Sequence, residues 1–102
     1  MRALYTFSMF ARKIRIEYFR EGVPTPAPIH WLDNFAMRSF TNDSVFDDTL
    51  PVADGLLEIG ARVPLELLAD RLTDWCRRKS YLSATASLRL TELESAGAPH
   101  LP

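Results

Sequence analysis

The chain has 102 residues, of which 47% are hydrophobic and 25% charged, and its formal net charge is −1. These values are typical of a single globular domain (residues 1–102) and argue against a disordered chain. No apolar run approaches the roughly 20 residues of a membrane-spanning helix, and one cysteine excludes an internal disulfide. We therefore expect a cytoplasmic protein without a membrane partner.

Charge is divided unevenly along the chain. Residues 1–20 hold five basic residues and one acidic residue. Residues 21–70 hold two basic and nine acidic residues, and residues 71–102 hold five basic and three acidic residues. A solvated surface of mixed charge explains this pattern most simply. A sharper interpretation is an acidic central face and a basic face from both ends, each suited to a charged partner.

Two N-terminal segments alternate between apolar and other side chains, which predicts strands near residues 2–10 and 13–20. A helix from Ser8 to Glu21 is the alternative, but the β-branched Ile14 and Ile16 favour strands. The segment after them, Gly22 to Pro28, contains three prolines and predicts a stiff, extended connector.

The middle of the chain predicts a helix near residues 28–40, where apolar residues recur at helical spacing. Residues 41–51 then predict a loop, because Asn, Asp, Ser and Pro punctuate them. Phe46 lies among acids in this loop. Such a residue usually pins a loop to the core, but it is also suited to anchoring a partner.

The next segment predicts a third strand near residues 56–63 and then the clearest helix of the chain, near residues 64–79. The helix has one apolar face, and Pro64 suits its first position. Glu66 suits the positive end of the helix dipole, whereas Arg77, Arg78 and Lys79 suit its negative end. Asp74 is placed to pair with Arg78 four residues later.

The segment from Leu82 to Gly97 permits two interpretations. Every second residue from Leu82 to Leu90 is apolar, which is the pattern of a half-buried strand. The same segment has helical spacing, with Ser83 as a possible N-cap and Gly97 as a stop. We slightly favour a helix near residues 83–96, and a composite of both forms is a third option.

The residues from Ser83 to Gly97 resemble the recognition helix of winged helix-turn-helix regulators, with a Ser/Thr-rich start, then Leu, Leu-Glu and Ala-Gly. The resemblance implies a DNA-binding transcription regulator. The expected DNA contacts are Arg77, Arg78, Lys79, Ser83, Thr85, Ser87 and Arg89. No room for a wing follows Gly97, and the sequence pI of about 6.1 is low for a DNA-binding protein.

Catalysis and cofactor binding have little support in the sequence. His30 and His100 are distant in the chain and have no recognisable partner motif, and Cys76 lies on an apolar helix face. No spacing matches a zinc site, a calcium loop or a phosphate loop. We therefore expect no enzyme activity, no metal and no cofactor.

The sequence thus predicts an α+β domain, in which a small mixed sheet packs against two or three helices. The function that we infer is a small non-enzymatic regulator or inhibitor that binds a macromolecule, foremost a protein complex. The expected protein-binding residues are in the acidic loop: Asp43, Phe46, Asp47 and Asp48. DNA binding is the alternative, and an exposed edge strand or helix face would allow a homodimer.

Overall fold

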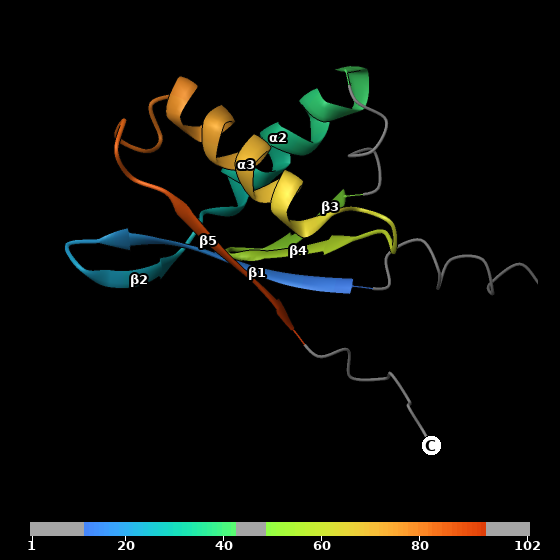
Figure 1. Cartoon of the computed structure of the whole chain (residues 1–102), viewed down its shortest axis with the longest axis horizontal. Coiled ribbons are helices and arrows are strands. Elements are labelled where there is room, and N and C mark those ends of the chain that lie inside the picture. Colours follow the sequence, from blue (N-terminus) through green and yellow to red (C-terminus); the bar gives the residue numbers. More distant parts are fainter. Residues whose placement is uncertain (1–11, 43–48, 94–102) are drawn as a thin grey trace, which may run out of the picture.

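The computed structural model describes the backbone of residues 12–42 and 49–93, in which two helices cover one face of a five-stranded sheet (Figure 1). The elements are β1 (Arg12–Arg20), β2 (Val23–Pro26), α2 (Ile29–Asn42), β3 (Thr49–Ala53), β4 (Leu56–Ile59), α3 (Leu65–Arg78) and β5 (Leu88–Leu93). The α+β class is therefore confirmed. Neither described helix has the length and apolar character needed to cross a bilayer.

Strand β1 is the centre of the sheet. Along one edge it pairs with β5, from Lys13 to Tyr18. Along the other edge it pairs first with β4 and then, beyond Ile16, with β2, while β3 pairs with the far side of β4. All these pairings are antiparallel, so the expectation of a mixed sheet is wrong for the described strands.

A three-way backbone junction marks the point where β1 changes partner. The Ile16 amide donates to the Gly55 carbonyl at 2.8 Å, the Gly55 amide donates to the Ala27 carbonyl at 2.6 Å, and the Ala27 amide donates to the Ile16 carbonyl at 3.0 Å. Gly55 has a φ of +70°, and a Cβ built there would lie 2.7 Å from the Cβ of Pro26. The junction therefore requires glycine at position 55.

The proline-rich segment predicted to be a connector is instead edge strand β2. Amide groups alternate in direction along a strand. Because the Ala27 amide points to β1, those of Val23 and Thr25 point the same way. Pro24 and Pro26 occupy the intervening positions, where no donor to β1 is required. Prolines two residues apart are thus compatible with this edge.

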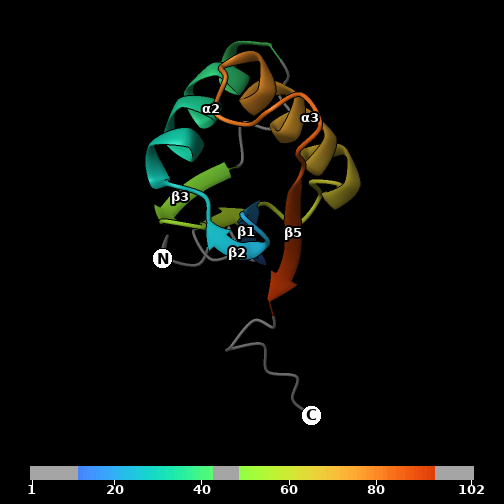
Figure 2. The same ribbon diagram turned by 90° about the vertical axis from the view of Figure 1, so that its left-hand side faces the viewer.

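The core lies between the sheet and the helices, which lie side by side on the same face (Figure 2). Alternation in β1 buries Ile14 and Ile16, and β4 adds Leu57 and Ile59 in the same way. The helices contribute fully buried side chains to the same cluster: Leu32, Leu68, Leu72 and Cys76. Burying one such Leu or Ile stabilises the fold by roughly 1.5–3 kcal/mol before entropic costs.

Both predicted central helices are confirmed, with shifted ends. Helix α3 begins at Leu65, and Pro64 is the extended residue before it, with φ −74° and ψ 123°. The expected pair of Asp74 and Arg78 forms at 3.2 Å, but both side chains are more than 60% exposed, so the pair contributes only a few tenths of a kcal/mol. Helix α2 runs to Asn42.

Two further boundaries differ from the sequence prediction. Strand β4 ends at Ile59, because residues 60–63 turn into α3 rather than continuing beside β1. Residues 49–51, predicted as loop, belong to β3, where pairing with β4 supplies their backbone hydrogen bonds. The predicted strand at residues 2–10 lies outside the described residues.

The expected helix at residues 83–96 is wrong where the structure describes it, because residues 88–93 form strand β5. Leu88 lies opposite Tyr18 and Leu90 opposite Ile16, so the apolar alternation of this segment faces the core. The pairing also satisfies the open edge of β1, which a helix would leave without partners. Residues 94–96 lie outside the described part.

Candidate binding surfaces

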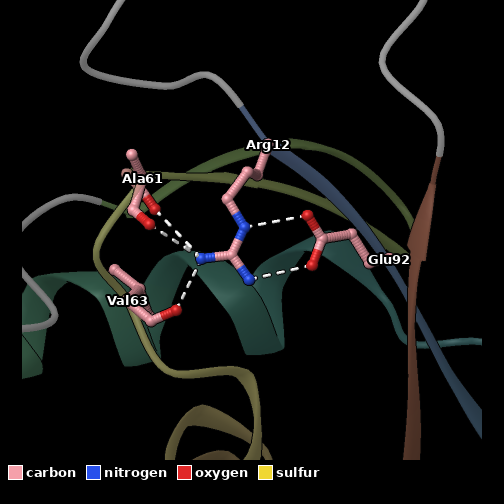
Figure 3. Close-up of polar contacts among 5 residues, drawn as sticks. Arg12, Ala61, Val63 and Glu92 are labelled. Atoms are coloured by element: carbon pink, nitrogen blue, oxygen red, sulfur yellow. Dashed lines mark hydrogen bonds and ion pairs between the residues drawn. The ribbon is translucent and has the colours of Figure 1, made fainter.

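The densest polar cluster of the described residues surrounds the guanidinium of Arg12 (Figure 3). Its Nε and Nη2 each donate to the Glu92 carboxylate at 2.8 Å, and its Nη1 donates to the carbonyl of Val63 at 2.6 Å. Longer bonds reach the carbonyls of Gly60 and Ala61. All three guanidinium nitrogens of Arg12 donate to groups of this chain, so the cluster has a structural role.

The two described candidates for chemistry, Cys76 and His30, lie in different settings. Cys76 is fully buried in the core, and burial raises the pKa of its thiol to about 12, so the reactive thiolate is scarce at neutral pH. His30 is exposed and contacts the rings of Trp31 and Tyr81 edge-on. The described residues contain no group of three acidic, His or Cys side chains that could hold a metal ion.

A basic hollow of about 580 Å³ lies where α3 ends and the chain turns toward β5. We call it the loop hollow; it is lined by Arg77, Arg78, Ser80, Tyr81, Leu82, Ser83 and Ala84. The helix above it ends in a Schellman motif: the Ser80 amide donates to the Arg77 carbonyl at 3.0 Å and the Tyr81 amide to the Cys76 carbonyl at 2.9 Å. The carbonyls of Cys76 and Arg77 are thereby occupied.

An aromatic stack holds this loop against the helices. The rings of Tyr81 and Trp31 are stacked, with centroids 5.0 Å apart and an interplanar angle of 3°. Trp75 meets Tyr81 edge-on at 5.6 Å, and the side-chain amide of Asn34 donates to the Tyr81 hydroxyl at 3.3 Å. Leu82 beside it is buried in the core. The loop is therefore anchored on its inner side, whereas Ser83 and Ala84 are exposed.

Arg77 spans the loop and holds its two sides together. Its Nε donates to the Ala86 carbonyl at 2.9 Å, and its Nη2 donates to the Ser87 hydroxyl at 3.2 Å. Among the described residues Arg78 pairs only with the exposed Asp74, and Lys79 lies over the Trp75 ring, 5.7 Å from its centroid. Two arginines thus border the hollow, one held in place and one able to move.

The structure brings together only part of the predicted nucleic-acid site. Arg77, Arg78 and Ser83 line the loop hollow, while Lys79 and Thr85 are exposed nearby in the chain. Arg89 lies elsewhere, on the sheet, where it pairs with Glu17 at 2.8 Å. The predicted protein-binding residues lie outside the described part of the chain: Asp43, Phe46, Asp47 and Asp48.

A second exposed surface, which sequence reasoning missed, is the sheet face opposite the helices (Figure 2). We call it the outer sheet face; strand register places on it Lys13, Arg15, Glu17, Phe19, Leu50, Leu56, Glu58, Arg89, Thr91 and Leu93. No described element covers this face. The outward residues of the β1 alternation were the available signal, but a single strand does not show whether another layer covers them.

Charges on the outer sheet face are mostly paired across strands. Arg89 pairs with Glu17, its guanidinium lies 5.0 Å from the ring centroid of Phe19, and Lys13 lies 4.0 Å from the Glu58 carboxylate. Arg15 forms no ion pair within the described residues. Phe19 and Leu50 remain 46% and 44% exposed. The face therefore combines apolar area with charges of both signs.

Comparison with known proteins does not assign either surface. Protein-family models, curated protein sequences and solved structures all give no significant match to this chain.

Proposed function

We propose that this chain is a small non-enzymatic regulator or inhibitor that binds a protein partner through its outer sheet face. The observation that carries the proposal is the face itself: a paired, antiparallel sheet with half-exposed Phe19 and Leu50 and no described layer over them. Mixed apolar and polar area of this kind is typical of non-obligate protein interfaces.

The face is also preformed. Strand β1, which runs through its middle, has its inner side chains Ile14 and Ile16 fully buried and pairs along both edges. A rigid surface loses little conformational entropy when a partner binds. The presence of Lys13 and Arg15 on the same face as Glu17 and Glu58 suits a protein of mixed charge better than a polyanion.

The acidic loop remains a separate part of the proposal. Asp43, Phe46, Asp47 and Asp48 stand between α2 and β3 in sequence and offer a second contact for the same partner. Joint alanine replacement of Phe46, Asp47 and Asp48 tests this contact. Unchanged partner affinity would remove these residues from the site and leave the sheet face unaffected.

Site-specific photo-crosslinking in the native cell tests the outer sheet face. A photoreactive residue at Leu50 should capture a discrete protein partner, and adding Phe19→Ala should reduce the yield. The matched control is the same residue at Met37, an apolar side chain of α2 that is 67% exposed on the helical layer. Equal capture from both positions, or capture unaffected by Phe19→Ala, would refute docking on this face.

We do not propose DNA binding through a recognition helix placed in a DNA groove. The resemblance that suggested it needs a helix through residues 88–93, which form β5, and Arg89 points to the outer sheet face. Support for anion binding comes only from the two arginines that line the loop hollow, Arg77 and Arg78.

A further inference from the structure

We propose that the loop hollow binds a single phosphate monoester, carried by a phosphorylated segment of a protein partner. This inference is independent of docking on the outer sheet face. Two arginines and two serines line the hollow, and no acidic residue is among its lining residues. Arginine guanidinium groups and short hydroxyl donors are the groups that recognise phosphate in proteins.

The hydrogen bonds of Arg77 leave one of its three guanidinium nitrogens for a ligand. Its Nε and Nη2 are used by Ala86 and Ser87, whereas Nη1 has no acceptor within the described residues. The fixed guanidinium therefore loses little freedom when it binds an anion. Arg78, whose side chain is 69% exposed, can leave the weak pair with Asp74 and complete a two-arginine clamp.

Backbone amides add to this donor set. The turn after Ser83 closes with the Ala86 amide donating to the Ser83 carbonyl at 3.2 Å. Ala84 lines the hollow, and its amide has no acceptor in the described part of the chain. A helix C-terminus normally repels anions, but here the carbonyls of Cys76 and Arg77 already accept hydrogen bonds from the loop.

Ser80 adds a hydroxyl-bearing side chain to the lining of the hollow from a strained backbone position. It occupies the C′ position of the Schellman motif with φ +65°, a left-handed conformation for which glycine is preferred. Serine there costs about 1 kcal/mol relative to glycine.

The charge around the hollow favours one phosphate over a nucleic-acid strand. Asp70 and Asp74 are exposed on the same helix, and the whole chain has a net charge of −1. A polynucleotide needs a continuous basic track, and it would meet these carboxylates beyond the two arginines. A single dianionic group on an otherwise neutral peptide meets the two arginines and competes with only one of these carboxylates, that of Asp74, for Arg78.

Binding is tested by nuclear magnetic resonance titration of the full chain with a short Gly/Ala/Ser peptide carrying one central phosphoserine. We expect saturable shifts at the Ser83 and Ala84 amides that the unphosphorylated peptide does not cause. Arg78→Gln should weaken binding roughly tenfold, the scale of one charge-assisted contact. The matched control Arg62→Gln, at an exposed arginine outside the hollow, should not weaken it.

Ser80→Gly separates binding from folding, because it should raise the stability of the chain and still weaken phosphopeptide binding. Phe19→Ala lies on the outer sheet face and should leave phosphopeptide binding intact. Failure of the sheet-face proposal can therefore be told apart from failure of the phosphate site. Equal binding of both peptides, or unchanged affinity in Arg78→Gln, would overturn the inference. Binding of single-stranded or duplex DNA without phosphopeptide binding would overturn it in favour of a polynucleotide site.

Discussion

The guanidinium of Arg12 donates two hydrogen bonds of 2.8 Å to the carboxylate of Glu92, although the residues are 80 positions apart in the sequence. The contact joins the start of β1 to the end of β5. The remaining nitrogen of Arg12 donates to the Val63 carbonyl just before α3, at 2.6 Å. One side chain thus links the centre of the sheet, its edge strand and the entry to the helical layer.

Arg12→Met should destabilise the fold more than Glu92→Gln. The methionine variant removes the donors of three loop carbonyls as well as the ion pair, which we expect to cost about 1–3 kcal/mol. Glu92→Gln leaves those bonds in place and should cost about 1 kcal/mol or less, because the carboxylate side is partly exposed. Urea denaturation measures both. Equal losses would contradict the role of the loop carbonyls.

Stability should fall on acidification because of Glu92. The hydrogen bond from Arg12 holds the pKa of Glu92 below its ordinary value of 4.5 in the folded state. The stabilisation is therefore present above pH 4.5 and is lost as pH falls below it through the lowered pKa. Unfolding free energies of the wild type and of Glu92→Gln should converge over this acidic range. Parallel curves would show that another carboxylate controls acid stability.

Replacement of two glycines by alanine should have unequal effects. Gly55 and Gly22 both have positive φ, of +70° and +80°, so alanine should cost each about 1 kcal/mol in backbone strain. At Gly55 the added Cβ also meets Pro26 at 2.7 Å, whereas at Gly22 nothing lies within 4 Å. We expect Gly55→Ala to cost about 1–3 kcal/mol more. Similar unfolding midpoints for the two variants would contradict the tight junction.

The thiol of Cys76 should be unreactive in the native protein. It is fully buried, and burial raises its pKa to about 12. A thiol-specific chromogenic reagent at mildly alkaline pH should therefore react only as fast as the chain opens. Addition of urea should accelerate the reaction to the rate of an unfolded cysteine. Rapid labelling without urea would show that the α3 face opens locally.

The elements predicted correctly are those whose local pattern and tertiary environment agree. The apolar face of α3 is complete within its own sequence, so its ends were predicted to within one residue. The alternation of Ile14, Ile16 and Tyr18 likewise matches β1, which is buried on one side. Site prediction was weaker: Arg77, Arg78 and Ser83 meet in one hollow, but Arg89 does not join them.

The sequence by itself determined the α+β class, strand β1 and the two helices, because hydrophobic periodicity is a local property. Only the tertiary structure decided the form of residues 88–93, where strand and helix patterns overlap and the open edge of β1 selects the strand. It likewise decided that Pro24 and Pro26 lie in β2, because their missing amides face away from β1. Pairing between distant segments is not encoded in either segment alone, so both outcomes required the assembled sheet.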